Sequence, residues 1–338
     1  MRNVYTFADH PEDHAFNWQP LANDASFVPF AIPPFQRRTP NGILVDTSNF
    51  ELGDYFDLFF PGEIFNLMSR ETNRYAENYL ETHQNLRRNS RFHKWRNTNA
   101  EEMNVFLGIE LSMGMCQKST IEEYWSNWMP NATHGYSQIM SRDRFELLRW
   151  FLHFNDNANF VAAGEEGYDP LFKVRPLLDE IDPQLLSVYQ PGKQLSLDES
   201  TYAFRGVSHF KVYNPKKPTR WGLKDYLLCE PKTGYVLRHI PYVGRYTAKP
   251  VDGNLVTEQI VLNLMEGFEN KGHIVNLDNY YTSPKLFLTL RNKNIGACGT
   301  VRINRTNMPQ AFKDMKLKRN DPPIFWSTGD LLAVAWHD

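Results

Sequence analysis

The 338-residue chain has little cysteine, and this scarcity excludes two kinds of scaffold. Its three cysteines, Cys116, Cys229 and Cys298, are far apart and odd in number, so they form neither a disulfide framework nor a zinc motif. The chain also has no apolar run near the roughly 18 residues of a membrane span. The opening stretch, MRNVYTFADHPEDHAF, lacks the apolar core of a signal peptide. We therefore expect a protein of a reducing compartment with no membrane partner.

Several common catalytic motifs are also missing. The ten histidines never adopt the HExxH spacing of a zinc hydrolase, and GACGT, at 296–300, is too short for a phosphate-binding loop. No serine, histidine and aspartate can be grouped into a nucleophilic triad from the sequence. The sequence therefore gives no signal for a zinc hydrolase, a phosphate-loop protein or a serine hydrolase.

The net charge of -2 conceals an asymmetry between two halves of the chain. Residues 1–190 carry 16 Lys and Arg against 26 Asp and Glu, whereas residues 191–338 carry 21 against 13. A basic half indicates a polyanionic partner, although a lopsided solvated surface would give the same counts.

The chain divides into segments of different character. Residues 1–45 are rich in Pro, Asn and Asp, so we expect a mostly disordered lead-in. Residues 46–190 contain four stretches with apolar side chains at helical spacing, which predicts a mostly helical domain. After Gly192 the pattern changes to three strands, a helix, a strand, a helix and a final strand. This order predicts an α/β domain, in a chain that is α+β overall, with parallel central strands covered by helices.

Two of the predicted strands end on aspartates. The strand QLSLDES, at 194–200, carries Asp198, and the apolar run of GHIVNLDNYYTS, at 272–283, ends on Asp278. If these strands are neighbours, both carboxylates lie at one edge of the sheet, where oxygen ligands suit Mg²⁺ or Mn²⁺. Such a metal site would act on a phosphodiester. The alternative is that each aspartate only caps a turn or a helix, the commoner role of an isolated Asp.

Basic and aromatic residues alternate in the stretch FKVYNPKKPTRWGLK, at 210–224. Its cations and aromatics are Lys211, Lys216, Lys217, Arg220 and Lys224 with Phe210, Tyr213 and Trp221. This composition predicts contacts with the phosphates and bases of DNA, or else a solvated basic hairpin. Two further clusters are Arg87, Arg88, Arg91, Lys94 and Arg96, and Lys313, Lys316, Lys318 and Arg319. Three basic clusters beside paired acids favour nucleic acid over a small acidic substrate.

Several motifs in a fixed order resemble one transposase family. They are SLDES, NPKKPTRWGLKDYLLCEPKTGYVL and LDNYYTSPKL, preceded by ETNRYA, FLGIELSMG, EEYWSNW, MSRDRFELLRWFLHFND and DPLFKVRPLLD. From about residue 50 to residue 338 the chain resembles the piggyBac family of cut-and-paste DNA transposases and their domesticated relatives. The resemblance implies that residues 46–190 form a dimerisation and DNA-binding domain. It implies that residues 191–305 form an RNase H-like catalytic-type domain, with a mixed sheet and flanking helices.

The resemblance also implies a catalytic site of three aspartates. Family members use this DDD motif with Mg²⁺ to cleave and join DNA at TTAA targets, and Asp198 and Asp278 match its first two positions. The third position follows a small insertion, of which residues 306–338 resemble only a part. We therefore expect a truncated insertion and an incomplete site. The aspartates that are candidates for the third ligand by residue type alone are Asp314, Asp321, Asp330 and Asp338.

Three functions are compatible with these patterns. The favoured one is a transposase-derived DNA-binding protein that keeps two of the three aspartates of a metal-dependent cleavage and strand-transfer site. The alternatives are an active transposase with an unidentified third ligand and a non-catalytic protein-interaction module, so enzymatic activity stays open. The expected partners are double-stranded DNA, a second copy of the chain and, if the site functions, Mg²⁺ or Mn²⁺. A DNA partner predicts a nuclear location.

Overall fold

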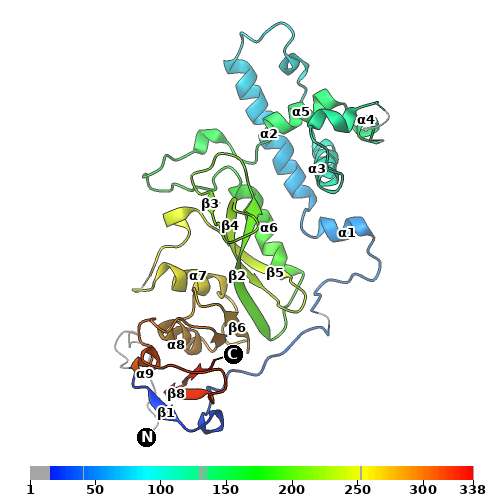
Figure 1. Cartoon of the computed structure of the whole chain (residues 1–338). Helices are drawn as coiled ribbons and strands as arrows, with labels where there is room; N and C mark the ends of the chain where they lie inside the picture. The colour runs from blue at the N-terminus through cyan, green and yellow to red at the C-terminus, as the bar shows by residue number, and fades with distance from the viewer. Residues whose placement is uncertain (1–15, 41, 129–131, 134, 252, 338) are drawn as a thin grey trace. The chain divides into compact units, whose positions relative to one another are not determined.

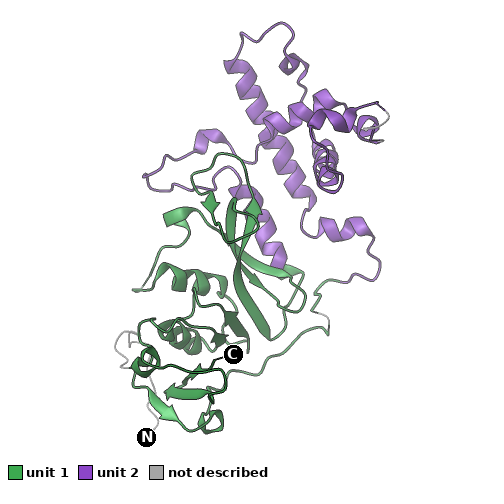
Figure 2. Ribbon diagram, viewed as in Figure 1, with its two compact units in different colours: residues 1–45, 186–338 green, residues 46–185 purple. Residues whose placement is uncertain are grey.

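A computed structural model of the chain describes residues 16–40, 42–128, 132–133, 135–251 and 253–337. The chain divides into two compact units, one of residues 46–185 and the other of residues 1–45 and 186–338 (Figure 1, Figure 2). Across the described part of the chain, no helix has the length and apolar character needed to cross a membrane.

The unit of residues 46–185 is built from helices. Its α-helices are α1 (Leu52–Asp57), α2 (Gly62–Thr82), α3 (Ala100–Met115), α4 (Tyr136–Ile139), α5 (Arg142–Phe151) and α6 (Arg175–Ser187), which runs just past the boundary. Short 3-10 turns lie at Arg91–Lys94, Ile121–Trp125 and Asn157–Asn159. Asn99 caps α3 and Ser141 caps α5, each accepting a main-chain hydrogen bond from the first turn. The core consists of apolar stripes at helical spacing: Ile64, Phe65, Met68, Met103, Phe106, Ile109, Phe145 and Leu148.

A six-stranded mixed sheet forms the centre of the other unit (Figure 1). Its strands are β2 (Gln194–Ala203), β3 (Val212–Tyr213), β4 (Trp221–Cys229), β5 (Val236–Pro241), β6 (Ile274–Leu277) and β7 (Gly296–Gly299). The order is β3-β4-β2-β6-β7, with β5 paired to β4. β2 is antiparallel to β4 and parallel to β6, and β6 is parallel to β7. Helices α7 (Val256–Leu264) and α8 (Pro284–Asn292) precede β6 and β7, which confirms the predicted α/β class with a parallel centre.

Alternating burial explains why β2 and β6 pair in one register. Leu195 and Leu197 of β2 are buried, as are Val275 and Leu277 of β6, and each leucine or valine stands opposite a buried residue on the other strand. A slip of one residue would turn this apolar set toward the opposite face of the sheet. The fixed register therefore determines which residues at the ends of the paired segment stand level with each other.

The N-terminal segment differs from its prediction as a disordered lead-in. Within residues 16–45, β1 (Gln19–Leu21) pairs antiparallel with β8 (Ile324–Thr328), in a second sheet of order β1-β8-β9. β9 spans Leu331–Ala335, and the remaining short elements of the unit are α9 at Gln310–Lys313 and 3-10 turns at Asp24–Ser26 and Gly244–Tyr246. The composition of the segment could not reveal this pairing, because its partner strand lies at the other end of the sequence. Residues 1–15, also part of the predicted lead-in, lie outside the described residues.

A glycine makes room for the N-terminal segment beside β6. Gly272 has φ of +76°, and a Cβ on it would lie 2.4 Å from the Pro33 carbonyl oxygen and 2.8 Å from the Phe35 Cα. The Phe35 ring also contacts the buried His273, with ring centroids 5.1 Å apart. The segment is therefore packed onto the backbone that leads into β6.

Candidate functional site

The two aspartates lie level with each other on neighbouring strands. β2 and β6 are parallel, and the register places Leu197 opposite Leu277. Asp198 directly follows Leu197, and Asp278 directly follows Leu277. Both aspartate side chains are exposed. The structure thus brings the two sequence-predicted acids together at the carboxyl end of β6, while their role as metal ligands stays a prediction.

One detail of the predicted placement is wrong, because β2 does not end at Asp198. The strand continues to Ala203, and residues 198–203 keep their pairing with β4 although β6 has already ended. Asp198 is therefore the first residue of β2 that pairs with β4 but not with β6. Asp278 is the first residue after the end of β6.

Within the described residues, each carboxylate accepts one hydrogen bond, from a nearby main-chain N–H. The Glu199 N–H donates to Asp198 Oδ1 at 2.8 Å, and the Tyr280 N–H donates to Asp278 Oδ1 at 2.9 Å. The Asp278 contact is the turn contact that the alternative interpretation predicts, whereas Asp198 lies within β2 and caps neither a turn nor a helix. A carboxylate offers about four lone-pair sites, and neither aspartate has an ion pair with any residue that the structure describes. Both therefore retain oxygen sites for a cation.

The donor set suits a hard divalent cation and supplies two carboxylates. Mg²⁺ is bound by one or two carboxylates together with waters and substrate phosphates, so two aspartates fit part of its coordination sphere. Among the described residues, no group of three His, Cys, Asp or Glu side chains could hold a metal ion. The remaining positions would fall to water and phosphate oxygens.

The candidates for a third ligand are placed elsewhere or have other partners. Asp330 forms an ion pair with Arg291 at 2.5 Å, and Asp321 accepts a main-chain hydrogen bond at 2.7 Å. Asp314 is the C-cap residue of α9. Asp338 lies outside the described residues. The three described aspartates thus do not complete a three-acid group with Asp198 and Asp278.

Glu199, to which the sequence assigns no role, is engaged through both oxygens. Its Oε2 accepts a hydrogen bond from the Tyr281 hydroxyl at 3.0 Å, and its Oε1 lies 3.5 Å from Lys224 Nζ. Tyr281 is 1% exposed, and burial together with the Glu199 charge raises the pKa of its phenol far above the usual range. The ammonium of Lys224 also lies over the rings of Tyr226 and Tyr280, at 4.4 and 5.4 Å. Glu199 thus links β2, β4 and the segment after β6.

Two cations of the predicted basic tract have partners inside the protein. Lys224 is partly buried and pairs with Glu199. Lys211 donates to the Gly206 carbonyl at 2.7 Å, and its ammonium lies 5.4 Å from the centre of the Trp221 ring. Their side chains stabilise the sheet and its hairpin, and a contact of either with DNA stays a prediction.

The other three cations of the tract, Lys216, Lys217 and Arg220, are exposed and are called the loop cations below. They lie between β3 and β4, and within the described residues none of them has an ion pair. Beside them the rings of Tyr213 and Trp221 pack 4.6 Å apart, and each residue is 52% exposed. Uncompensated charge next to exposed aromatic rings is the arrangement that phosphates and bases contact.

The second predicted cluster lies in the helical unit, between α2 and the 3-10 turn at Arg91–Lys94. Arg87 and Arg88 are exposed. Arg91 forms an ion pair with Glu146, and Lys94 forms one with Asp143. Acids of the same unit therefore neutralise part of this cluster, which leaves Arg87 and Arg88 as its freer cations.

Two arginines that the sequence analysis missed hold the turn after Asp278. Arg302 Nε donates to Asn279 Oδ1 at 3.1 Å, and Arg305 donates to the Asn279 carbonyl at 3.1 Å and to the Tyr280 carbonyl. The signal that could have found them is the pair of arginines in VRINR, directly after the strand that neighbours β6.

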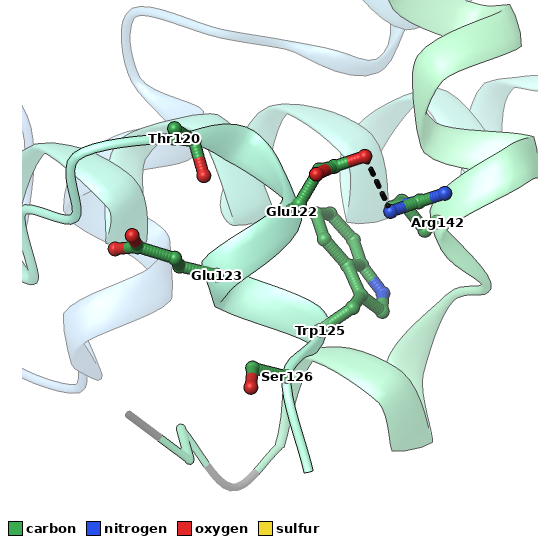
Figure 3. A pocket seen from close by; sticks show the side chains of 6 residues that line it. All are labelled: Thr120, Glu122, Glu123, Trp125, Ser126 and Arg142. Atoms are coloured by element: carbon green, nitrogen blue, oxygen red, sulfur yellow. Dashed lines mark hydrogen bonds and ion pairs between the residues drawn. The ribbon is translucent and has the colours of Figure 1, made fainter. Parts of the chain in front are cut away.

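A separate hollow lies in the helical unit (Figure 3). Its walls are formed by Thr120, Glu122, Glu123, Trp125, Ser126 and Arg142. The guanidinium of Arg142 forms an ion pair with Glu122 at 2.9 Å across it. None of the sequence-predicted site residues lines this hollow, so the candidate site is the exposed edge of the sheet.

The fold has a solved counterpart of known class. A piggyBac transposase synaptic complex with hairpin DNA, determined by cryo-electron microscopy, matches with a TM-score of 0.70 and 25% identity. The match covers 88% of this chain and 63% of the other. The mixed sheet with acids at the ends of its parallel strands is thus the RNase H-like fold of the DDE class of transposases.

Sequence comparison identifies the family within that class. The model of the family described as Transposase IS4 matches residues 53–338, and the chain belongs to this family, in its piggyBac group. PiggyBac transposable element-derived protein 2 of Homo sapiens is 28% identical over 291 residues, 84% of this chain and 46% of the relative. PiggyBac transposable element-derived protein 5 of Homo sapiens is 21% identical over 303 residues, 84% of this chain and 54% of the relative. The chain spans about half the length of these curated relatives.

Proposed function

We propose that this chain is a piggyBac transposase-derived protein that binds double-stranded DNA and presents a two-aspartate site for a divalent cation. The observation that carries the proposal is the parallel register of β2 and β6, which sets Asp198 and Asp278 level at one edge of the sheet. The uncompensated loop cations belong to the same unit and support the DNA partner.

Separate groups of residues would bind DNA and hold the metal ion. The loop cations would hold phosphates through charge, and Tyr213 and Trp221 would stack on exposed bases. Asp198 and Asp278 would hold Mg²⁺ or Mn²⁺, which supplies Lewis-acid activation of an oxygen nucleophile when it is bound. Arg302 and Arg305 would keep the turn that carries Asp278 in place.

Plasmid nicking in the presence of Mg²⁺ or Mn²⁺ separates the catalytic alternative from simple binding. The proposal predicts duplex binding in low salt with little or no nicking, because only two aspartates of the DDD pattern are present among the described residues. Nicking that disappears in both Asp198→Ala and Asp278→Ala would establish the alternative of an active transposase with a third ligand still to be identified. Wild-type nicking in both variants would refute the metal assignment.

The partner and location are part of the same proposal. A DNA partner would require a nuclear location, and the resemblance of residues 46–190 to a dimerisation domain leads us to expect a homodimer. Light scattering of the free and DNA-bound chain tests the dimer, and a fluorescent fusion tests the location. No duplex binding at low salt would leave the non-catalytic protein-interaction module as the remaining function.

A further inference from the structure

A side-chain hydrogen bond connects the two segments that carry Asp198 and Asp278. Glu199 directly follows Asp198, and Tyr281 lies three positions after Asp278. The Tyr281 hydroxyl donates to Glu199 Oε2 at 3.0 Å. We propose that this hydrogen bond is a positioning link that sets the separation of the Asp198 and Asp278 carboxylates. The inference rests on the proposed function of these two aspartates.

The link is needed because the backbone ladder stops just before the site. The last paired residues of β2 and β6 are Leu197 and Leu277. Beyond them β2 continues beside β4, whereas the chain after β6 turns away toward α8. The strand pairing that sets the two aspartates level therefore stops one residue before each of them, so side-chain contacts are available to fix their separation more closely.

Each end of the link is joined rigidly to its aspartate. The main-chain carbonyl of Asp278 accepts hydrogen bonds from the Tyr281 N–H at 3.3 Å and from the Thr282 N–H and hydroxyl at 3.1 and 2.8 Å. On the other strand, the Glu199 N–H donates to the Asp198 carboxylate at 2.8 Å. A displacement of Glu199 relative to Tyr281 would therefore displace one aspartate relative to the other.

The contacts of Glu199 bear on whether its carboxylate could be the third metal ligand. One oxygen accepts from Tyr281, and the other pairs with Lys224 of β4 at 3.5 Å. A carboxylate whose two oxygens are used in this way is held from two directions. Glu199 is therefore held in place as a positioning residue, and within the described part of the chain it does not form a three-acid metal group with the two aspartates.

The test uses Tyr281→Phe, which removes the hydroxyl and keeps the buried ring. The chain offers a matched control in Tyr189→Phe, because Tyr189 also donates to a buried glutamate, Glu230, in the same unit. We expect faster amide hydrogen exchange over residues 278–283 in Tyr281→Phe and an unchanged rate there in Tyr189→Phe. We also expect the Mn²⁺ affinity of Tyr281→Phe to fall about tenfold, the lower end for loss of a group that orients metal ligands.

A double-mutant cycle shows whether the two groups act through each other. Glu199→Ala also removes the pair with Lys224, so it should increase exchange at least as much as Tyr281→Phe. Adding Tyr281→Phe to Glu199→Ala should change little, because the link is already broken. Wild-type exchange over 278–283 in Tyr281→Phe, or fully additive effects in the cycle, would overturn the positioning link. Absence of Mn²⁺ binding by the wild type would refute the proposed metal site alone, because the exchange measurement decides the link without metal.

Discussion

Replacing the three loop cations tests the DNA interface with a predictable magnitude. Lys216, Lys217 and Arg220 are exposed and have no ion pair within the described structure, so each is available for one phosphate. Each phosphate contact contributes about 0.9 to the slope of log affinity against log salt, so three contacts contribute about 2.7. From 50 to 200 mM, salt rises fourfold. Over that range the ratio of the wild-type binding constant to that of the triple alanine variant should fall about 40-fold.

The assay is fluorescence anisotropy of a labelled duplex titrated at several salt concentrations. The matched control replaces Lys193, Lys232 and Lys271 by alanine. These lysines are exposed and lie in the same unit, and their replacement removes the same net charge. The control should keep the wild-type slope. An equal loss of slope in both variants would show a general charge effect and refute a specific contact at the loop cations.

Two further predictions concern stability. Burial alone would raise the pKa of Glu102, but hydrogen bonds from Arg144 and Thr98 hold it below its usual value of 4.5. In urea denaturation, Arg144→Met should lower the free energy of unfolding by about 2 kcal/mol at neutral pH, because the half-buried Glu102 loses its charged hydrogen bonds from the buried Arg144 and keeps only Arg96 and Thr98. The lowered pKa means that the stabilisation is present above about pH 4.5 and is lost as the pH falls through the folded-state value. Gly272→Ala should destabilise the chain by more than about 1 kcal/mol through its positive φ and the clash with the N-terminal segment. Gly234→Ala, with φ of +74° and open space around it, should cost less.

Each stability prediction has an outcome that contradicts it. If the difference between the wild type and Arg144→Met stayed constant from pH 7 to pH 3, the ion pair would not be its source. If Gly272→Ala and Gly234→Ala cost the same, the contact with Pro33 would contribute nothing, and only the backbone conformation would matter.

The sequence predicted the central sheet because its signals are local. Short apolar runs such as those around Leu197 and Leu277 identify strands by themselves, and the alternation of strands with helices favours parallel neighbours. The order left open whether β2 and β6 are neighbours, and the structure shows that they pair, with Asp198 and Asp278 directly after the last paired residues. The N-terminal strand β1 could not be predicted, because a three-residue strand has no pattern of its own and depends on β8 for pairing.

The missed parts of the site depend on contacts between distant segments. Nothing in the sequence indicates that Tyr281 would reach Glu199 or that Lys224 would be partly buried against the same carboxylate. Composition also cannot distinguish Arg91, which pairs with Glu146, from the exposed Arg87 beside it. Charge clusters therefore located the candidate surfaces, while the structure was needed to separate compensated from uncompensated cations.

The most direct test of the central claim is a Mn²⁺ titration of the wild type, Asp198→Asn and Asp278→Asn, with free Mn²⁺ measured by electron paramagnetic resonance. Asp314→Asn is the control, because it removes an exposed carboxylate of the same unit outside the candidate site. If Asp198 and Asp278 form one site, the wild type and the control bind Mn²⁺ saturably with equal affinity, and each site variant binds at least about tenfold more weakly. Equal affinity in all four proteins, or no saturable binding by the wild type, would contradict the account.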